Sequence, residues 1–350
     1  MKILVVKFRN IGDVLLTTPL FANLRAHFPS ATIHAAINAE SLPMLEGNPN
    51  IDAIFAYERA RIKKLGILAR LREEWRYLRQ FRSGYDVLIN TTEGERGAWI
   101  AQLARPTIHV APARNLLLRP THLFTPYKGH IIDHHLEAIS LLGHEIVGKA
   151  ATLVYGAQHL ARLRELGLPP RYVHFHPLSR WQFKCIDDAL SAAIIDYIQN
   201  ELGIPVVLSA APNEAEMGRI ATILSLCASE PLNFAGKLNL KELAALAGNA
   251  TAFVGVDTAT MHIAAALDTP TIAFFVASAV FHWGAWDNAL TDCPYTDQDG
   301  IQRMGKHSIF VKNSARKDRE IMQNREKNGT FTLENFDWEA FRRELSEKLR

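Results

Sequence analysis

The chain reads Val254-Gly255-Val256-Asp257-Thr258-Ala259-Thr260-Met261-His262-Ile263-Ala264-Ala265-Ala266 where an apolar strand, residues 252–256, meets a helix of small residues. In α/β proteins such a strand, turn and helix start hold phosphate, because free backbone N–H groups and the positive end of the helix dipole face the ligand. Asp257 and Thr258 are suited to cap the helix or to bind a ligand hydroxyl. The alternative is an ordinary capped helix whose His262 lies in the core.

Length and composition limit the class of protein. The 350 residues are 48% hydrophobic and 21% charged, which indicates a folded chain of two ordinary domains. A net charge of +3 gives no reason to expect nucleic acid as a partner. Cys185, Cys227 and Cys293 are scattered, so neither a disulfide framework nor a cysteine zinc site is expected. The sequence shows no signal peptide and no run of 18 apolar residues, so we expect a cytoplasmic protein without a membrane span.

Short β-branched runs alternate with helical patterns along most of the chain. The strands expected in the first half are residues 3–6, 32–37, 53–56, 86–90 and 108–111. Those expected in the second half are residues 172–176, 206–209, 232–234, 252–256 and 271–276. This alternation predicts an α/β fold with parallel sheets, and two such series predict two doubly wound, Rossmann-like domains that face a central cleft.

Glycine and proline in Leu166-Gly167-Leu168-Pro169-Pro170 end a helix and mark the expected domain boundary. The expected domains are residues 1–168 and 169–330. Residues 312–329 are polar and highly charged, which is typical of an exposed or disordered segment. Asp337 is expected to cap a final helix, within residues 331–350, that packs back across the domains.

The first strand leads into Asn10-Ile11-Gly12-Asp13-Val14, where a Gly-x-Gly-x-x-Gly dinucleotide motif is absent. Because Gly12 stands alone, a nicotinamide cofactor is not expected in this domain. Asp13 places a carboxylate at the turn from loop to helix, where it suits a general base facing the cleft. The alternative role of Asp13 is that of an N-cap.

Ser179 and Lys184 follow the first strand of the second half, where the chain reads His174-Phe175-His176-Pro177-Leu178-Ser179-Arg180-Trp181-Gln182-Phe183-Lys184. Lysine supplies a point charge for a diphosphate leaving group, although many lysines are simply solvated. His174 and His176 fall on one side of the strand, but no third ligand is evident, so no metal is expected. Glu214 follows another strand, where it suits either a sugar hydroxyl or the start of a helix.

Residues 59–82 form a basic segment with the apolar spacing of a helix. The apolar positions, expected to face the core, are Leu65, Leu68, Leu71, Trp75 and Leu78. The basic positions are Arg59, Arg61, Lys63, Lys64, Arg70, Arg72, Arg76, Arg79 and Arg82. The basic surplus is either a solvated face or a surface for an anionic acceptor or membrane, with Arg61, Lys63 and Lys64 as candidate acceptor-binding residues.

Together these motifs resemble the ADP-heptose:lipopolysaccharide heptosyltransferases of glycosyltransferase family 9, from residue 1 to about residue 290. The matching motifs are Gly12-Asp13-Val14-Leu15 with Thr18-Pro19, His176-Pro177-x-Ser179 with Lys184, Pro212-x-Glu214, and Val254-Gly255-x-Asp257-Thr258-Ala259-x-x-His262-x-Ala264. Ser179-Arg180-Trp181 is most similar to the branch that adds the third heptose. Ala259 departs from the family pattern, because many members carry glycine there.

The resemblance implies a GT-B fold whose N-terminal domain binds the acceptor and whose C-terminal domain binds the nucleotide sugar. It implies an inverting, metal-independent transfer of heptose from ADP-L-glycero-D-manno-heptose to a heptose of the lipopolysaccharide inner core, without a cofactor. Asp13 then matches the catalytic base. The donor-binding residues that we expect are Ser179, Lys184, Glu214, Asp257, Thr258, Ala259 and His262. A lipid-linked acceptor also implies peripheral contact with the inner face of the inner membrane.

Other classes of protein share parts of this pattern. A two-lobed periplasmic binding protein has a similar architecture, but the missing signal sequence argues against it. Another nucleotide-sugar transferase or an epimerase of GT-B fold would share the donor loop, and an epimerase would not need the basic segment. A non-catalytic sugar-nucleotide binder is a further alternative, which donor hydrolysis without transfer would indicate.

Overall fold

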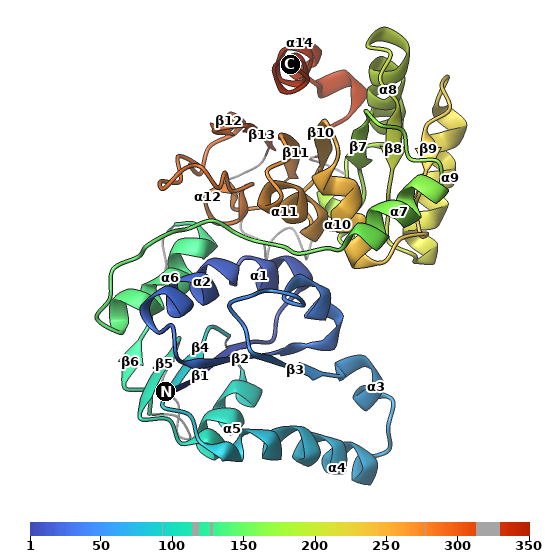
Figure 1. Cartoon of the computed structure of the whole chain (residues 1–350). Coiled ribbons are helices and arrows are strands. Elements are labelled where there is room, and N and C mark those ends of the chain that lie inside the picture. The colour runs from blue at the N-terminus through green and yellow to red at the C-terminus, as the bar shows by residue number, and fades with distance from the viewer. Residues whose placement is uncertain (93, 114–118, 127–128, 277, 313–329) are drawn as a thin grey trace. The chain divides into compact units, whose positions relative to one another are not determined.

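The computed structural model describes residues 1–92, 94–113, 119–126, 129–276, 278–312 and 330–350 (Figure 1). The chain divides into two compact units, of which unit 1 is Met1–Val154 and unit 2 is Tyr155–Arg350. Among the helices of these described ranges, none is both long and apolar enough to cross a membrane.

Unit 1 is built on a six-stranded parallel sheet. Its strands are β1 (Lys2–Lys7), β2 (Thr32–Asn38), β3 (Ala53–Tyr57), β4 (Val87–Asn90), β5 (Ile108–Ala111) and β6 (His122–Leu123). They lie in the order β3-β2-β1-β4-β5-β6. The chain therefore adds β2 and β3 on one side of β1, and then β4, β5 and β6 on the other side. This order is that of a doubly wound fold, which places ligands where β1 and β4 end side by side.

Helices cover both faces of the sheet in unit 1 (Figure 1). They are α1 (Ile11–Leu15), α2 (Thr18–His27), α3 (Arg59–Lys63), α4 (Ile67–Leu78), α5 (Glu95–Ala104) and α6 (Ile131–Leu141), with 3₁₀ segments at Ala39–Met44 and Arg79–Ser83. Leu4 and Val6 of β1 share one core with Tyr77, Phe81 and Ala101, which fixes α4 and α5 on that face. The helices α1, α2 and α6 cover the other face.

Unit 2 is built on a seven-stranded sheet with the same winding. Its strands are β7 (Val173–His176), β8 (Val206–Leu208), β9 (Leu232–Asn233), β10 (Ala252–Val256), β11 (Thr271–Val276), β12 (Gly300–Met304) and β13 (His307–Lys312). The order is β12-β13-β11-β10-β7-β8-β9, and only β12 is antiparallel to its neighbour. The strand order therefore reverses between β7 and β10, as it does between β1 and β4 in unit 1.

The sheet of unit 2 also separates two helical layers. Its helices are α7 (Ala157–Glu165), α8 (Asp188–Asp196), α9 (Glu214–Leu226), α10 (Leu240–Gly248), α11 (Ala259–Ala266), α12 (Val280–Trp283) and α14 (Trp338–Lys348), with 3₁₀ segments at Gln182–Lys184 and Leu333–Asn335 and a π-helical turn at Tyr197–Glu201. Ile194 of α8, Ile220 of α9 and Phe341 of α14 share one core. Leu163 of α7 and Leu246 of α10 belong to the core of the opposite face.

The ten strands expected from the sequence are all present, each within one residue at either end. The sequence pattern missed β6, which has two residues, and the hairpin of β12 and β13, because β12 is largely polar and half-exposed. Contacts divide the chain at Val154 and Tyr155, whereas glycine and proline indicated residues 166–170, because α7 packs into unit 2 through Leu163. Most of the charged segment at 312–329 lies outside the described residues.

The expected burial of the apolar stripe in residues 59–82 is wrong for three of its five members, whereas Leu65 and Leu78 are half-buried and Leu78 packs on the core of unit 1. Leu68, Leu71 and Trp75 are exposed, and the buried side chains of this segment are Ile62, Tyr77 and Phe81. Two causes are visible. The first is that Gly66 is the N-cap of α4 and separates it from α3, so the segment is not one helix. The second is that α4 turns Tyr77 toward the sheet, where the Tyr77 hydroxyl donates to the Phe55 carbonyl at 2.9 Å.

The final helix, α14, packs on the sheet of unit 2. The Asp337 carboxylate accepts a hydrogen bond from the Ala340 backbone at 2.9 Å, which confirms the expected N-cap. Phe341 stacks at 6.3 Å from Phe274 of β11, measured between ring centroids. The buried Glu344 carboxylate pairs with Arg303 and accepts from the Ser308 hydroxyl at 2.6 Å, so it is not left unpaired in the core.

Gly255 is required by the close pairing of β7 and β10. A Cβ at this position would lie 2.7 Å from the His176 carbonyl oxygen and 2.6 Å from the Phe253 ring. Relieving the contact with the carbonyl would require the backbone of β7 to shift, which costs free energy of folding. We expect Gly255→Ala to lower the free energy of unfolding by about 1–3 kcal/mol, the usual cost of overpacking. The matched control is Gly218→Ala on α9, where the added methyl meets open space and should stabilise by about 0.5–1 kcal/mol. Urea denaturation followed by circular dichroism measures both, and an unchanged or raised stability for Gly255→Ala would contradict the packing argument.

Candidate active site

The candidate donor residues gather where β7 and β10 end side by side. Lys184 lies in the 3₁₀ segment that follows β7, and Asp257 follows β10 directly. The two strands are parallel neighbours at the reversal of strand order, and open α/β sheets bind ligands at such a point. The structure therefore brings together two elements that are 73 residues apart in the sequence.

An ion pair joins these two elements. The Lys184 ammonium donates to the Asp257 carboxylate, with 2.5 Å between Nζ and Oδ2. Burial alone would raise the pKa of the Asp257 carboxyl, but the Lys184 charge, with hydrogen bonds from Lys184 and Ser278, holds that pKa below its usual range. Asp257 is thus ionised at neutral pH and fixes the ammonium group of Lys184 over the end of the sheet.

The N-terminus of α11 lies in the same place. Thr258 is its N-cap residue, but the Thr258 hydroxyl donates to the Val256 carbonyl at 3.3 Å and does not cap the helix. The first backbone N–H groups of a helix have no partner within that helix, and the helix dipole makes this end positive. Ala259 begins the helix and keeps its N–H group, and His262 is buried one turn later. This arrangement suits a phosphate group.

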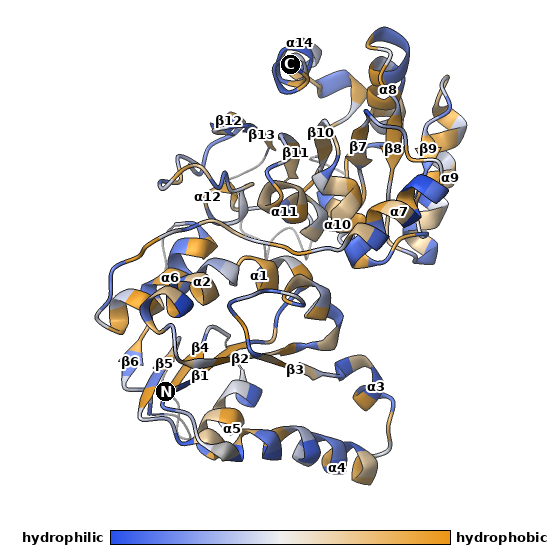
Figure 2. Cartoon of the chain, viewed as in Figure 1, coloured by the Kyte–Doolittle hydropathy of each residue, from blue (hydrophilic) through white to orange (hydrophobic). Residues whose placement is uncertain are grey.

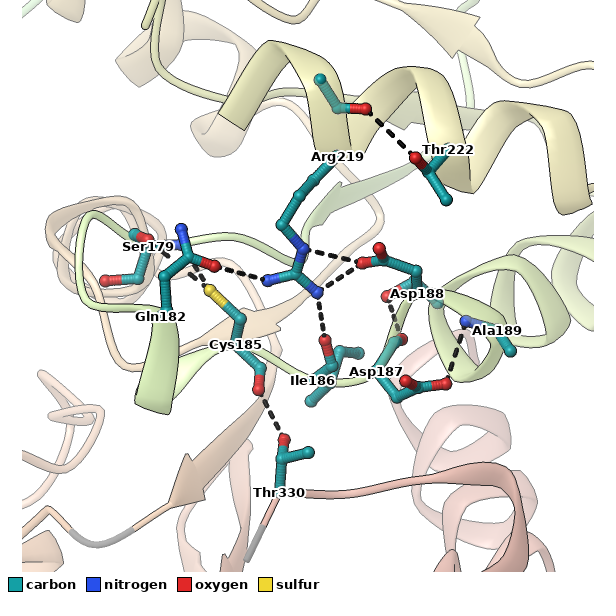
Figure 3. Close-up of polar contacts among 12 residues, drawn as sticks. Ser179, Gln182, Cys185, Ile186, Asp187, Asp188, Ala189, Arg219, Thr222 and Thr330 are labelled. Carbon is teal, nitrogen blue, oxygen red and sulfur yellow. Dashed lines mark hydrogen bonds and ion pairs between the residues drawn. The ribbon is translucent and has the colours of Figure 1, made fainter. Parts of the chain in front are cut away.

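The loop that carries Lys184 is held by groups that sequence reasoning missed. Figure 3 shows the Arg219 guanidinium of α9 between Gln182, Ile186 and Asp188. It donates to the Gln182 side chain at 3.1 Å, to the Ile186 carbonyl at 2.9 Å and to the Asp188 carboxylate at 2.9 Å. Gln182 and Ile186 flank Lys184 on both sides, so Arg219 limits the positions that the lysine can take. An arginine inside a distant helix carries no sequence signal for this role.

Ser179 begins the same loop and is buried. Its hydroxyl accepts from the Trp181 backbone at 3.2 Å, and its own N–H donates to the Cys185 sulfur at 3.2 Å. Burial raises the pKa of the Cys185 thiol, so this cysteine serves as a neutral packing group. Ser179 therefore shapes the loop through these two hydrogen bonds.

The two histidines of β7 form a neutral network beneath the site. The side chains of His174 and His176 lie 2.7 Å and 2.8 Å from the same Ser209 hydroxyl, as expected for one side of a strand. Burial lowers the pKa of His176 to about 4 and that of His174 well below its usual range, so both are uncharged at neutral pH. Across the described ranges, no three His, Cys, Asp or Glu side chains gather as metal ligands would.

Glu214 and Glu216 differ sharply at the start of α9. Glu214 is exposed at the first helical position. Glu216 is buried, and its carboxylate accepts from the Ala211 backbone at 2.8 Å and from the Asn213 side chain at 3.0 Å. Glu216 therefore holds the turn after β8, while Glu214 keeps a carboxylate available to a ligand hydroxyl.

In unit 1, the candidate base Asp13 lies beyond the end of β1, in the helix that follows it. It occupies the first turn of α1, directly after β1, and its side chain is half-buried. The N-cap of α1 is Asn10, so Asp13 does not have the alternative capping role. Within the described part of the chain, its carboxylate forms no hydrogen bond or ion pair. It is therefore available to accept a proton.

A buried lysine lies near Asp13 and was not anticipated. Lys7 ends β1, and its Nζ lies 2.9 Å from Nε2 of His135 and 3.4 Å from the Thr91 carbonyl. Burial lowers the pKa of Lys7 to about 8, and the charge of Asp13 opposes that effect. The lysine stays largely protonated at neutral pH. A lysine at the end of an apolar strand was the available sequence signal.

The candidate acceptor residues lie at the end of α3. Arg61 pairs with Glu73 of α4 at 2.9 Å, so part of its charge is already neutralised. Lys63 and Lys64 are exposed, and neither forms an ion pair with any residue that the structure describes.

The family model and the similar proteins found by sequence comparison are all heptosyltransferases. A family model, glycosyltransferase family 9 (heptosyltransferase), matches residues 74–309. The chain is 30% identical to lipopolysaccharide heptosyltransferase 3 of Escherichia coli, over 80% of this chain and 84% of that protein. It is 21% identical to the lipopolysaccharide core heptosyltransferase OpsX of Haemophilus influenzae, over 85% and 82%.

Two solved structures show the fold. A glycosyltransferase family 9 protein from Veillonella parvula has a TM-score of 0.81 at 19% identity and covers 99% of this chain and 97% of its own. The E. coli ADP-heptose LPS heptosyltransferase II has a TM-score of 0.70 at 18% identity, covering 100% and 98%. These likenesses and the two doubly wound units confirm the expected GT-B fold class.

The role of Arg219 is testable by its removal. Arg219→Met keeps the aliphatic length but loses the donors, so the loop of Lys184 should become mobile and ADP affinity should fall roughly tenfold, as for a loss of about 1.4 kcal/mol. Thr222→Ala is the control, because Thr222 lies one turn away on α9 and its hydroxyl donates only to the Gly218 carbonyl. Calorimetric titration with ADP measures both. Unchanged affinity in a folded Arg219→Met protein would show that the guanidinium does not position the lysine.

Proposed function

Because the chain belongs to glycosyltransferase family 9, we propose that this glycosyltransferase moves heptose from ADP-L-glycero-D-manno-heptose to a heptose of the lipopolysaccharide inner core. The observation that carries the proposal is the Lys184–Asp257 pair beside the N-terminus of α11. It provides a cation and unpaired backbone donors at one point, which is what a leaving diphosphate requires.

In the proposed donor site, the diphosphate lies against the N–H groups at the start of α11 and takes over part of the charge of Lys184. As the C1–oxygen bond breaks, negative charge grows on the departing ADP, and these fixed donors stabilise it more in the transition state than in the bound donor. Asp257 keeps Lys184 in place, while Ser179, Thr258, Ala259 and His262 shape the loop. The exposed Glu214 carboxylate is proposed to accept from a ribose hydroxyl.

In the proposed transfer step, Asp13 accepts the proton of an acceptor heptose hydroxyl while that oxygen attacks C1 of the donor. The attack occurs on the face opposite ADP, so the configuration at C1 inverts. Neither step draws on a metal ion or cofactor in this proposal, because Lys184 and the helix N-terminus supply the positive charge. Among the described residues, the carboxylate of Asp13 has no hydrogen-bond partner that a proton transfer would have to displace, which supports its role as base.

The acceptor is proposed to be lipid-linked and to be met at the inner face of the inner membrane. Lys63 and Lys64, with Arg61, would pair with phosphate and carboxylate groups of its core sugars. The alternatives are another nucleotide-sugar transferase or epimerase of the same fold and a non-catalytic sugar-nucleotide binder. Release of ADP without a new glycosidic bond would favour the last of these.

Donor choice is tested by nucleotide binding. We expect ADP to bind more tightly than UDP or GDP with no metal added, and EDTA to leave binding unchanged. Lys184→Ala should weaken ADP binding by about 1.5–3 kcal/mol, the usual value of a charge-assisted hydrogen bond. Isothermal titration calorimetry measures these affinities. A strict requirement for Mg²⁺ or Mn²⁺, or preference for UDP, would reject the proposed donor site.

The base is tested by Asp13→Asn, which keeps the size of the side chain and removes its basicity. Loss of a general base costs about 10²–10⁴-fold in rate, so kcat should fall in that range. ADP affinity and melting temperature should stay close to the parent values, because Asp13 lies in unit 1 and does not cap α1. Transfer assays with truncated lipopolysaccharide cores measure kcat. If the variant retains more than about a tenth of the parent rate, Asp13 is not the base.

A further inference from the structure

Helix α4 carries an exposed stripe of large apolar side chains that no described part of unit 1 covers. Ile67 is 79% exposed, Leu68 84%, Leu71 61% and Trp75 49%. Because successive residues of an α-helix are about 100° apart, Leu68, Leu71 and Trp75 fall within about 60° of arc. Figure 2 shows this alternation of hydrophobic and hydrophilic residues along α4. Isolated exposed apolar residues are ordinary, but a stripe of this size marks an interaction surface.

Arginine side chains border the apolar stripe. Arg72, Trp75, Arg76 and Arg79 line a surface hollow of about 240 Å³, and Arg82 lies over the Trp75 ring at 4.6 Å. Residues 59–82 contain nine basic and two acidic side chains. Arg72 and Arg79 form no ion pair with any described residue. Arg76 pairs with Glu73, so the hollow presents an aromatic ring and a surplus of positive charge to the same ligand.

The helix is held firmly by its other side, so the stripe is a stable surface. Tyr77 is buried and bonded to β3, and Phe81 is buried in the same core. The two acidic residues are used internally, because Glu73 pairs with Arg61 and Arg76, and Glu74 pairs with Arg96 at 3.2 Å. The packing that orients α4 thus leaves its apolar and basic side chains facing outward.

We propose that α4 docks the protein on an anionic lipid bilayer, with Leu68, Leu71 and Trp75 in the headgroup–acyl boundary and the hollow around a lipid phosphate. Helices that lie in a membrane surface combine these features: an apolar face with Trp and Leu, and a polar face rich in arginine. A sugar phosphate alone offers nothing to the apolar stripe. A second copy of the chain would bring like charges together. The proposal deepens the proposed function, because it names the surface that meets the membrane of the lipid-linked acceptor.

The first test is co-sedimentation of the full chain with vesicles, without donor or acceptor. We expect binding to vesicles of phosphatidylethanolamine with phosphatidylglycerol, weaker binding as salt rises, and little binding to phosphatidylcholine alone. The triple substitution Leu68→Ser, Leu71→Ser and Trp75→Ser should lower the partition coefficient at least about tenfold. Because these side chains are exposed, the melting temperature should stay near that of the parent. Leu226→Ser is the matched control, since Leu226 is 51% exposed on α9 of unit 2, and it should bind as the parent does.

The second test locates Trp75 relative to the bilayer. Lipids brominated near the headgroup should quench part of the tryptophan fluorescence of the parent. Trp75→Phe keeps an apolar ring, so it should retain vesicle binding but lose most of that quenching. Arg72→Glu, Arg76→Glu and Arg79→Glu together should abolish the preference for phosphatidylglycerol.

Three outcomes would overturn the proposal. One is vesicle binding by the apolar triple variant at the parent level. Another is equal quenching in the parent and in Trp75→Phe. The third is a parent that ignores vesicles but forms dimers that the triple variant abolishes, which would assign the stripe to a second copy. Failure of the proposed function is distinguishable, because Asp13→Asn should bind vesicles normally, and the triple variant should still transfer to a delipidated acceptor.

Discussion

The structure of unit 2 depends on one constraint: β7 and β10 must pair closely enough for the groups beyond their ends to meet. Gly255 permits this approach, since any side chain there would meet the carbonyl of His176. Beyond the strands, the Lys184–Asp257 pair then closes at 2.5 Å beside the start of α11. The neutral histidines and Ser209 lie beneath it and add no charge at neutral pH. The Lys184 ammonium, balanced by the Asp257 carboxylate, and the positive end of the α11 dipole thus meet at one point of the sheet edge.

The sequence predicted the regular part of this architecture well. Buried parallel strands are near-continuous apolar runs, so Ala252–Val256 and Thr271–Val276 could be recognised without any tertiary information. The family resemblance assigned Lys184 and Asp257 to one donor site, but the ion pair between them was not predicted. What could not be predicted was set by distant contacts. Arg219 reaches its three partners from another helix, and β12 gains its strand conformation from pairing with β13.

The error at α4 has a different physical origin. Helical spacing shows that a stripe exists, but it does not show which of two faces the sheet will cover. The chain offered both the Leu68–Leu71–Trp75 face and the Tyr77–Phe81 face, and the hydroxyl of Tyr77, which bonds to the Phe55 carbonyl, accompanies burial of the second. The apolar face left over is therefore not a failed core. It is the side of the helix that does not contribute to the core of unit 1, because Tyr77 and Phe81 fill that role.

Lys7 has a thermodynamic consequence that reaches beyond the candidate site. Its pKa is about 8 in the folded chain and 10.5 for an unperturbed lysine, so between these values the unfolded chain binds more protons than the native one. Proton linkage then makes unit 1 more stable as pH rises from about 8 to about 10.5, and below pH 8 the full cost of burying the ammonium, of order 3 kcal/mol, remains. Unit 1 thus gives up stability at neutral pH to keep a charge beside Asp13. In alkaline solution Lys7 loses its charge. The same deprotonation that stabilises the fold also removes a positive charge from the surroundings of the Asp13 carboxylate.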